Sequence, residues 1–148
     1  MRLTRKTALA IEAVVDIAFH ARPDPVQARD ITERQGVPHR YLEQVLQRLV
    51  REGVLRGVRG PRGGYTLARE RRRLTLGDVV RVISAMDSEE EAVTFGPGIG
   101  ALVVAPVWEA ASNEMLARFD GVTLEELCRQ AQAIGIPGPE GASQDFSI

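Results

Sequence analysis

The sequence predicts a mainly α-helical protein that carries one small β-hairpin. Apolar residues recur at helical spacing in several separate stretches, and two short β-prone runs flank the turn "RGPRGG". The chain has 148 residues, of which 44% are hydrophobic and 26% are charged, so it is long enough to build one real core. We therefore expect a single domain with a small appendage.

The first two helices are bounded by strong helix-breaking residues. From Thr4 to about Ala21 apolar side chains fall on more than one side, which predicts a largely buried helix. Pro23 and Pro25 end it, because proline disfavours helical geometry in the residue before it. A short second helix follows over Ala28–Gln35, and Gly36 is expected to cap it in the left-handed conformation.

The third helix is amphipathic, with one buried side and one basic side. Pro38 suits its first turn, where the missing N–H would be unpaired anyway. The buried positions follow the i, i+3, i+4, i+7 pattern, and they are Leu42, Val45, Leu46 and Leu49. The opposite side carries long hydrogen-bonding side chains, namely Arg40, Gln44, Gln47, Arg48 and Arg51. Two helices joined by the tight turn "QGVP", the second one basic outside, form a helix-turn-helix pattern.

The hairpin that follows strengthens this interpretation. Its strands are expected at 54–58 and 65–68, and its Gly, Pro and Arg tip can bury almost nothing. Glycines at the tip remove side-chain bulk, so Arg59 can approach a narrow groove closely. A helix fits the major groove of DNA, while an arginine on a thin loop suits a compressed minor groove. Duplex DNA therefore satisfies the helix and the hairpin together.

The net charge of −1 hides a strong asymmetry. Up to Thr75 there are sixteen Lys and Arg against eight Asp and Glu, whereas the remainder has three against twelve. A basic half joined to an acidic half indicates that the basic half meets a polyanion such as DNA, with a solvated surface as the simpler alternative.

The second half predicts three more helices around a glycine-rich connection. Thr75 and Asp78 form a capping box for a fourth helix, and Thr123 with Glu126 repeats that spacing for a sixth helix that ends near Ile134. A fifth helix is expected over 106–119, after an acidic and glycine-rich loop at 85–104. The tail, 135–148, is expected to be disordered.

The sequence shows no sign of catalysis, metal binding or export. No nucleophile–base set, paired carboxylates or cofactor fingerprint is visible, and "FGPGIGA" is better explained as a linker than as a phosphate-binding loop. Cys128 is the single cysteine, and with His20 and His39 far away it leaves no ligand spacing; a redox role would need pairing between chains. The start lacks a cleavage pattern and the longest apolar run, "ALVVAPVW", is far too short to span a membrane, which favours the cytoplasm.

Several segments together carry a family resemblance. They are "MRLTRKTALAIEAVVDIAFH", "DITERQGVPHRYLEQVLQRLVREGVLRGVRGPRGGYTLAR" and "LTLGDVVRVI", with weaker matches at Trp108 and "TLEEL". The "YLEQ" followed by "VRGPRGGY" is the most specific part. The chain resembles the Rrf-two (Rrf2) family of bacterial winged-helix regulators, which includes an iron–sulfur regulator, a nitric-oxide sensor and a regulator of cysteine metabolism. The resemblance implies a homodimer on a two-fold operator, with long C-terminal helices that cross at the dimer interface and a wing arginine in the minor groove.

The resemblance also assigns roles to individual residues. The family's base-reading positions fall on Pro38, Arg40, Tyr41 and Gln44, and its wing contact on Arg59. Pro38 and Arg40 depart from the small hydroxyl residues common there, so we expect a different operator. The full expected DNA-binding set is Pro38, His39, Arg40, Tyr41, Gln44, Arg48, Arg59 and Arg62, and the expected dimer interface is Val107, Trp108, Ala111, Met115 and Phe119. A ligand pocket between the dimer helices is the weaker alternative for the aromatic residues of that interface.

The family's cluster-binding members place three cysteines, often with a histidine, just before the tryptophan-bearing helix. The matching segment here, "DSEEEAVTFGPGIGALVVAPVW", contains neither residue. Because iron–sulfur clusters need thiolate or imidazole ligands, we expect no cluster, no metal and no other cofactor.

The sequence therefore predicts a winged helix-turn-helix domain at 1–84, a flexible loop at 85–104 where the family has its sensor, dimerisation helices at 105–134 and a disordered tail at 135–148. The expected function is a homodimeric, sequence-specific DNA-binding regulator, a repressor more often than an activator, whose effector is a small molecule or a protein. The alternative is an interaction module that binds an enzyme or RNA polymerase through its arginines.

Overall fold

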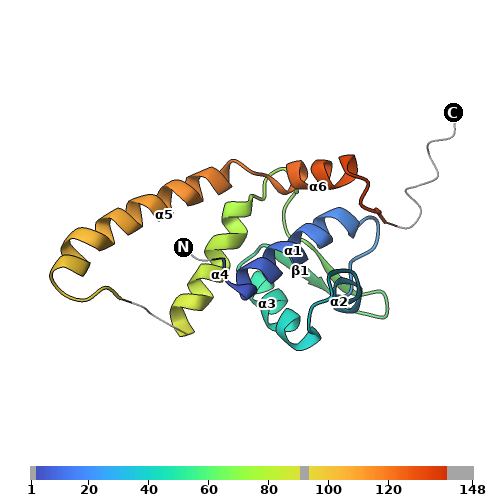
Figure 1. Cartoon of the computed structure of the whole chain (residues 1–148). Helices are drawn as coiled ribbons and strands as arrows, with labels where there is room; N and C mark the ends of the chain where they lie inside the picture. Colours follow the sequence, from blue (N-terminus) through green and yellow to red (C-terminus); the bar gives the residue numbers. More distant parts are fainter. Residues whose placement is uncertain (1–2, 91–93, 140–148) are drawn as a thin grey trace.

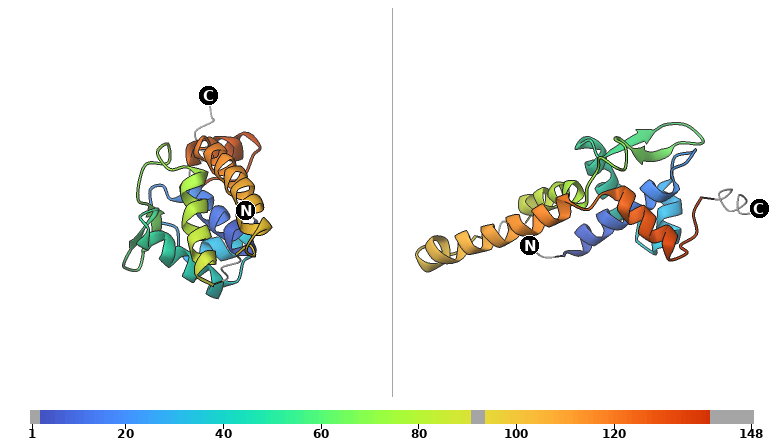
Figure 2. Two further views of the ribbon diagram at one scale, coloured as in Figure 1. Left: turned by 90° about the vertical axis from the view of Figure 1, so that its left-hand side faces the viewer. Right: turned by 90° about the horizontal axis from the view of Figure 1, so that it is seen from above.

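The computed structural model describes residues 3–90 and 94–139, and for residues 87–90 it describes the backbone alone. Six α-helices and one hairpin are present in these residues (Figure 1). The helices are α1 (Arg5–His20), α2 (Ala28–Gln35), α3 (His39–Arg51), α4 (Leu76–Glu90), α5 (Ala105–Asp120) and α6 (Leu124–Ala133); the strands are β1 (Leu55–Val58) and β2 (Gly64–Leu67). This confirms the predicted mainly helical fold with a small hairpin. Most elements form a compact body, from which α5 projects (Figures 1 and 2).

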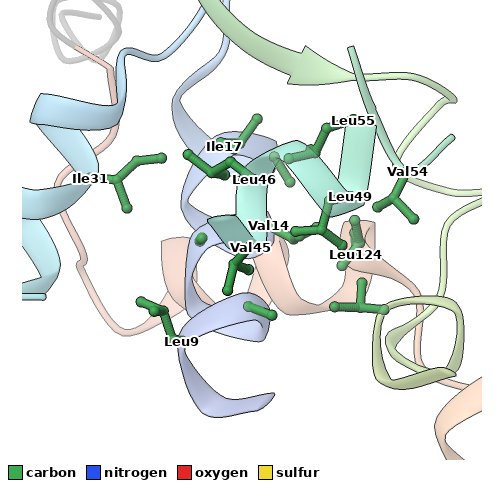
Figure 3. Close-up of a cluster of buried hydrophobic side chains, with 14 of the residues drawn as sticks. Leu9, Val14, Ile17, Ile31, Val45, Leu46, Leu49, Val54, Leu55 and Leu124 are labelled. Carbon is green, nitrogen blue, oxygen red and sulfur yellow. The ribbon is translucent and has the colours of Figure 1, made fainter. Parts of the chain in front are cut away.

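The hydrophobic core lies around α1, which packs against α3, α4 and α6. Ile17 of α1, Leu46 of α3 and Ile83 of α4 are fully buried, and Leu124 brings α6 into the same cluster (Figure 3). Burying one such side chain stabilises the fold by about 1.5–3 kcal/mol. The predicted stripe of α3, from Leu42 to Leu49, is buried in full. The core therefore fixes the orientation of α3 and leaves its other side outward.

A buried carboxylate joins α1 to α2. The side chain of Asp16 is fully buried and accepts hydrogen bonds from Arg34 Nε (2.9 Å) and Nη2 (2.7 Å). Gln35 Nε2 donates a third bond to it at 2.8 Å. A buried charge is tolerated only when it is paired in this way. This network holds α2 in place, and with it the turn into α3.

The turn between α2 and α3 follows the sequence closely. Gly36 caps α2 with φ +65°, in the left-handed region that the prediction required. Pro38 is the N-cap of α3, with φ −64° and ψ 129°, one residue earlier than the predicted first-turn position. The physical reason is that the extended ψ of Pro38 leaves His39 as the first helical residue.

The hairpin is antiparallel, and Leu55 pairs with Leu67 and Val58 with Gly64. Its second strand is tied to the body close to the tip, because Tyr65 N donates to Val26 O (2.7 Å) and Val26 N donates to Tyr65 O (2.9 Å). At the tip a Cβ on Gly63 would overlap the carbonyl oxygen of Val58, so only glycine fits there. The tip is therefore thin, as predicted, and the strand that follows it is anchored to the body.

The C-terminal half departs from the predicted boundaries. The capping box of α4 is present, since Thr75 N donates to Asp78 Oδ2 (3.0 Å) and Asp78 N donates to Thr75 Oγ1 (3.1 Å). However, α4 extends to Glu90, because residues 85–90 are mostly good helix formers. A π-helical turn, η1 (Gly100–Val104), then runs directly into α5. Helical backbone thus occupies both ends of the segment that we expected to be a flexible loop.

The start of the tail packs against the body. Residues 135–139 follow α6, and a ring nitrogen of His20 lies 3.1 Å from the carbonyl oxygen of Pro137. This contact places Pro137 beside the end of α1. The remaining residues of the expected tail, 140–148, lie outside the described residues. Within the described ranges, no helix combines the length and the apolar character that crossing a bilayer requires.

Candidate nucleic-acid interface

The outer side of α3 is a continuous exposed surface. Pro38, His39, Arg40, Tyr41 and Gln44 are all exposed, and the ring-bearing side chain of Tyr41 is 58% exposed. These residues occupy the side opposite the buried leucines and valine, so one helix both fills the core and presents polar groups. Its dimensions allow it to enter a DNA major groove.

Two of the α3 side chains that the sequence nominated have acidic partners four residues further along the chain. His39 Nε2 lies 3.1 Å from Glu43 Oε1, an ion pair only when the imidazole is protonated. Arg48 Nε lies 3.2 Å from Glu52 Oε1, and the arginine side chain is only 19% exposed. Arg48 therefore lies at the edge of the exposed surface, whereas Arg40 and Gln44 lie on it.

The hairpin carries its arginines outward. Arg56, Arg59 and Arg62 are all exposed, and across the described ranges none of the recorded ion pairs includes them. The arginines are thus not held by the acidic half of the same chain. Figure 2 shows the hairpin extending away from the body beside α3. The exposed side of α3 and the hairpin therefore form two neighbouring surfaces that carry arginine side chains.

Tyr65 connects the hairpin to α3 electrostatically. Its half-buried phenol has a raised pKa, chiefly because burial disfavours the phenolate and secondarily because the Glu43 carboxylate is near. The group therefore remains a neutral hydrogen-bond donor over the physiological range. Sequence reasoning treated Tyr65 as a strand residue alone, since its neighbourhood depends on the fold.

The predicted dimer surface is exposed in the single chain. No residue of α5 is buried, and Val107 (68%), Trp108 (52%) and Met115 (41%) expose much of their apolar surface. Ala111 is also exposed, and Phe119 is half-buried. The exposed apolar surface continues into η1 through Ile99, Leu102 and Val103, which sequence reasoning missed because it assigned them to a linker. Phe95 contacts Trp108 edge to face, with ring centroids 6.5 Å apart.

The donor set does not fit an iron–sulfur cluster. Cys128 is buried in α6, and burial raises its pKa, while Arg71 nearby acts in the opposite direction. His20 ends α1 and His39 begins α3, so the only thiol and the two imidazoles lie on three different helices. Throughout the part of the chain that the structure describes, no cluster of His, Cys, Asp and Glu could hold a metal ion. A cluster requires several such ligands at one point.

Two helices joined by a tight turn, an exposed second helix and a basic hairpin directly after it define a winged helix-turn-helix protein of the DNA-binding class. A family model described as Rrf2, an iron-dependent transcriptional regulator, matches residues 3–130. The HTH-type transcriptional regulator IscR of Xenorhabdus nematophila is 35% identical over 141 residues, which cover 92% of this chain and 84% of that protein.

Solved structures agree with the sequence comparison. The structure of IscR from T. potens is similar with a TM-score of 0.73 and 31% identity, over 93% of both chains. The structure of CymR (YrzC), the global cysteine regulator of B. subtilis, is similar with a TM-score of 0.66 and 25% identity, over 88% of this chain and 98% of that one. The chain belongs to the Rrf2 family of transcriptional regulators. It is a DNA-binding regulator and not an enzyme.

Proposed function

We propose that the protein is a cytoplasmic, homodimeric repressor that occludes a two-fold operator and works without an iron–sulfur cluster. The observation that carries this proposal is the pair of adjacent exposed surfaces, α3 and the hairpin, whose arginines Arg40, Arg59 and Arg62 have no recorded ion pair among the described residues. In the dimer, each α3 lies in a major groove and each hairpin reaches an adjacent minor groove.

Each side chain takes a role that suits its chemistry. Arg40 can donate two hydrogen bonds to guanine, and Gln44 can pair with adenine. Tyr41 and His39 supply further donors, while Pro38 presents an apolar edge. Arg59 enters the minor groove, and Arg62 with the partly buried Arg48 contacts phosphate. The base-reading residues determine which operator sequence is preferred. The phosphate contacts determine where the protein lies on the duplex and how strongly binding depends on salt.

The dimer forms through α5. A helix with no buried side chain has little to stabilise it, because most helical stability in proteins comes from packing of an apolar face. A second copy would cover Val107, Trp108, Ala111, Met115 and Phe119 by symmetry. The effector is then a small molecule or a protein, because the segment 87–108 lacks the thiolate and imidazole ligands that a cluster needs.

The experiment that tests the proposal begins with selection of fragments from the protein's own genome. We expect a palindromic site with half-sites about 10–10.5 base pairs apart, or a multiple of that spacing. Arg59→Ala should weaken binding to this site at least tenfold, about 1.4 kcal/mol, while circular dichroism stays unchanged.

A matched control is Arg129→Ala, on α6. Arg129 is an exposed arginine that pairs with Glu126 at 3.0 Å, and α6 lies at the opposite end of the body from α3 (Figures 1 and 2). We expect this variant to bind like the parent. Equal binding by Arg59→Ala and the parent at several salt concentrations would contradict the role of the wing, and enrichment of no common site would contradict the function.

A further inference from the structure

A groove of about 840 Å³ lies between the first half of α1 and the start of α3. One wall is formed by Pro38, Arg40, Tyr41 and Gln44, which the proposed function already assigns to DNA. The opposite wall belongs to α1, which packs beside α3 (Figure 1). The α1 wall has no part in the proposed function, although the groove is continuous with the base-reading surface.

The lining of the groove combines positive charge with apolar carbon. Arg5 and Lys6 stand on the α1 wall and Arg40 on the α3 wall, against one carboxylate, Glu12. Both arginines are exposed. The lining also includes the apolar residues Ala8, Leu9 and Val37, so an occupant meets both apolar carbon and positive charge. A sugar–phosphate strand alternates carbon-rich sugars with anionic phosphates, which is the chemistry that this combination suits.

The charges of the first helical turns support the same conclusion. Negative side chains stabilise the first turn of a helix, and positive ones destabilise it. Accordingly, α2 carries Asp30, α4 carries Asp78 and α6 carries two glutamates in the first turn. The helices α1, α3 and α5 have no acidic residue in the first turn, but α1 and α3, which begin at the groove, differ from α5 in beginning with the basic pairs "RK" and "HR". The sequence gives up local helix stability at these two places, as proteins do where a surface must meet a ligand.

We propose that this groove holds the backbone of the DNA strand that borders the major groove read by α3, and that Arg5 and Lys6 contact its phosphates. The inference rests on the proposed function and extends the DNA-binding surface from α3 and the hairpin to α1. Each half-site is then held on both sides of the recognition helix: by the hairpin on one side and by the start of α1 on the other. A segment of a second copy would be the other possible occupant of such a groove, and the test separates the two.

The test uses Arg5→Gln, Lys6→Gln and the double variant of the full-length protein. Affinity is measured over a range of salt concentrations for two probes: the duplex enriched from genomic fragments and a random-sequence duplex. Each lost phosphate contact should reduce the slope of log affinity against log salt by about 0.9. The ratio of the two affinities should stay unchanged, because phosphate contacts carry no sequence information. Arg129→Gln is the matched control and should retain the parental slope.

The outcomes are distinct from those of the proposed function. If the double variant keeps the parental slope while Arg59→Ala weakens binding, the α1 contact is wrong and the proposed function stands. If neither variant changes binding to either duplex, the proposed function itself fails. A selective loss on the enriched duplex would show base reading instead of phosphate contact, and a loss of dimer with an unchanged slope would assign the groove to a second copy; both overturn the inference. Circular dichroism of the single variants checks that each is folded.

Discussion

Arg40 is the departure from the family pattern that bears most directly on the base preference of this chain. Its guanidinium is exposed at the second position of α3, where small hydroxyl residues are common in that pattern. An arginine can make two hydrogen bonds to guanine that a hydroxyl group cannot make. Arg40→Ala should therefore relax the base preference at one position of each half-site, at a cost of about 1–3 kcal/mol for the preferred base.

The measurement for Arg40 is selection from a random duplex library, followed by affinity for single-base variants of the selected site. Arg51→Ala is a suitable control, because Arg51 is an exposed arginine in the last turn of the same helix. We expect this control to leave the base preference as it is. An unchanged preference in Arg40→Ala would place Arg40 on phosphate instead of on a base.

Asp16 is a residue whose importance the sequence could not reveal. It lies in an apolar helix at a position where a carboxylate would be expected to face solvent, but its side chain is fully buried. Its partners, Arg34 and Gln35, are 18 and 19 residues away in the chain, so only the fold brings them together. Local patterns predict periodicity and caps, whereas pairing between elements depends on their final orientation.

At the scale of elements, the shape of the hairpin tip depends on Gly63. A Cβ on Gly63 would overlap the backbone carbonyl of Val58, whereas a Cβ on Gly57 would meet open space. Gly63→Ala should therefore force the tip to change shape, at a cost of about 1–3 kcal/mol of local strain, and move Arg59 away from its position in the groove. We expect a clear loss of operator affinity, while the core remains folded because the tip contributes nothing to it.

Gly57→Ala provides the matched control for the hairpin, since both changes add one methyl group to the same element. The measurements are operator affinity, which reports on the position of Arg59, and thermal unfolding, which checks that both variants keep a folded core. If Gly57→Ala and Gly63→Ala weaken binding equally, the shape of the tip is not what positions Arg59.

The bounds of the helices show which features can be predicted from residues that are close together in the sequence. The caps at Gly36 and Thr75 and the buried stripe of α3 were predictable, because each depends on residues a few places apart. The helical backbone at 85–90 and 100–104 was not, because glycine and acidic residues nearby outweighed the helix formers in our interpretation. The exposed surface of α3 could be predicted from its periodicity, but the groove that it shares with α1 could not, since α1 meets α3 only in the folded chain.

At the scale of the whole molecule, the apolar side chains of α5 stay exposed in the single chain. It projects from the body without burying any of its residues, and its pairing with α4 includes an exposed ion pair in which Arg81 Nη2 lies 2.7 Å from Asp120 Oδ2. Arg81 lowers the pKa of that carboxyl, so the pair is present at neutral pH and is lost as the pH falls through the lowered value. An exposed pair of this kind contributes little. The projecting helix therefore needs an apolar partner.

Trp108→Asp should separate the dimer into folded monomers. The substitution places a charge in the middle of the apolar surface that the partner would cover, whereas in the single chain the side chain is half exposed and the core does not include it. Sedimentation should show the loss of dimer, and operator affinity should fall by far more than affinity for a single half-site, because two linked half-sites reinforce each other. Glu109→Gln, an exposed change at the next position, should leave both properties intact. A Trp108→Asp protein that still sediments as a dimer would mean that α5 is covered by something other than its own copy.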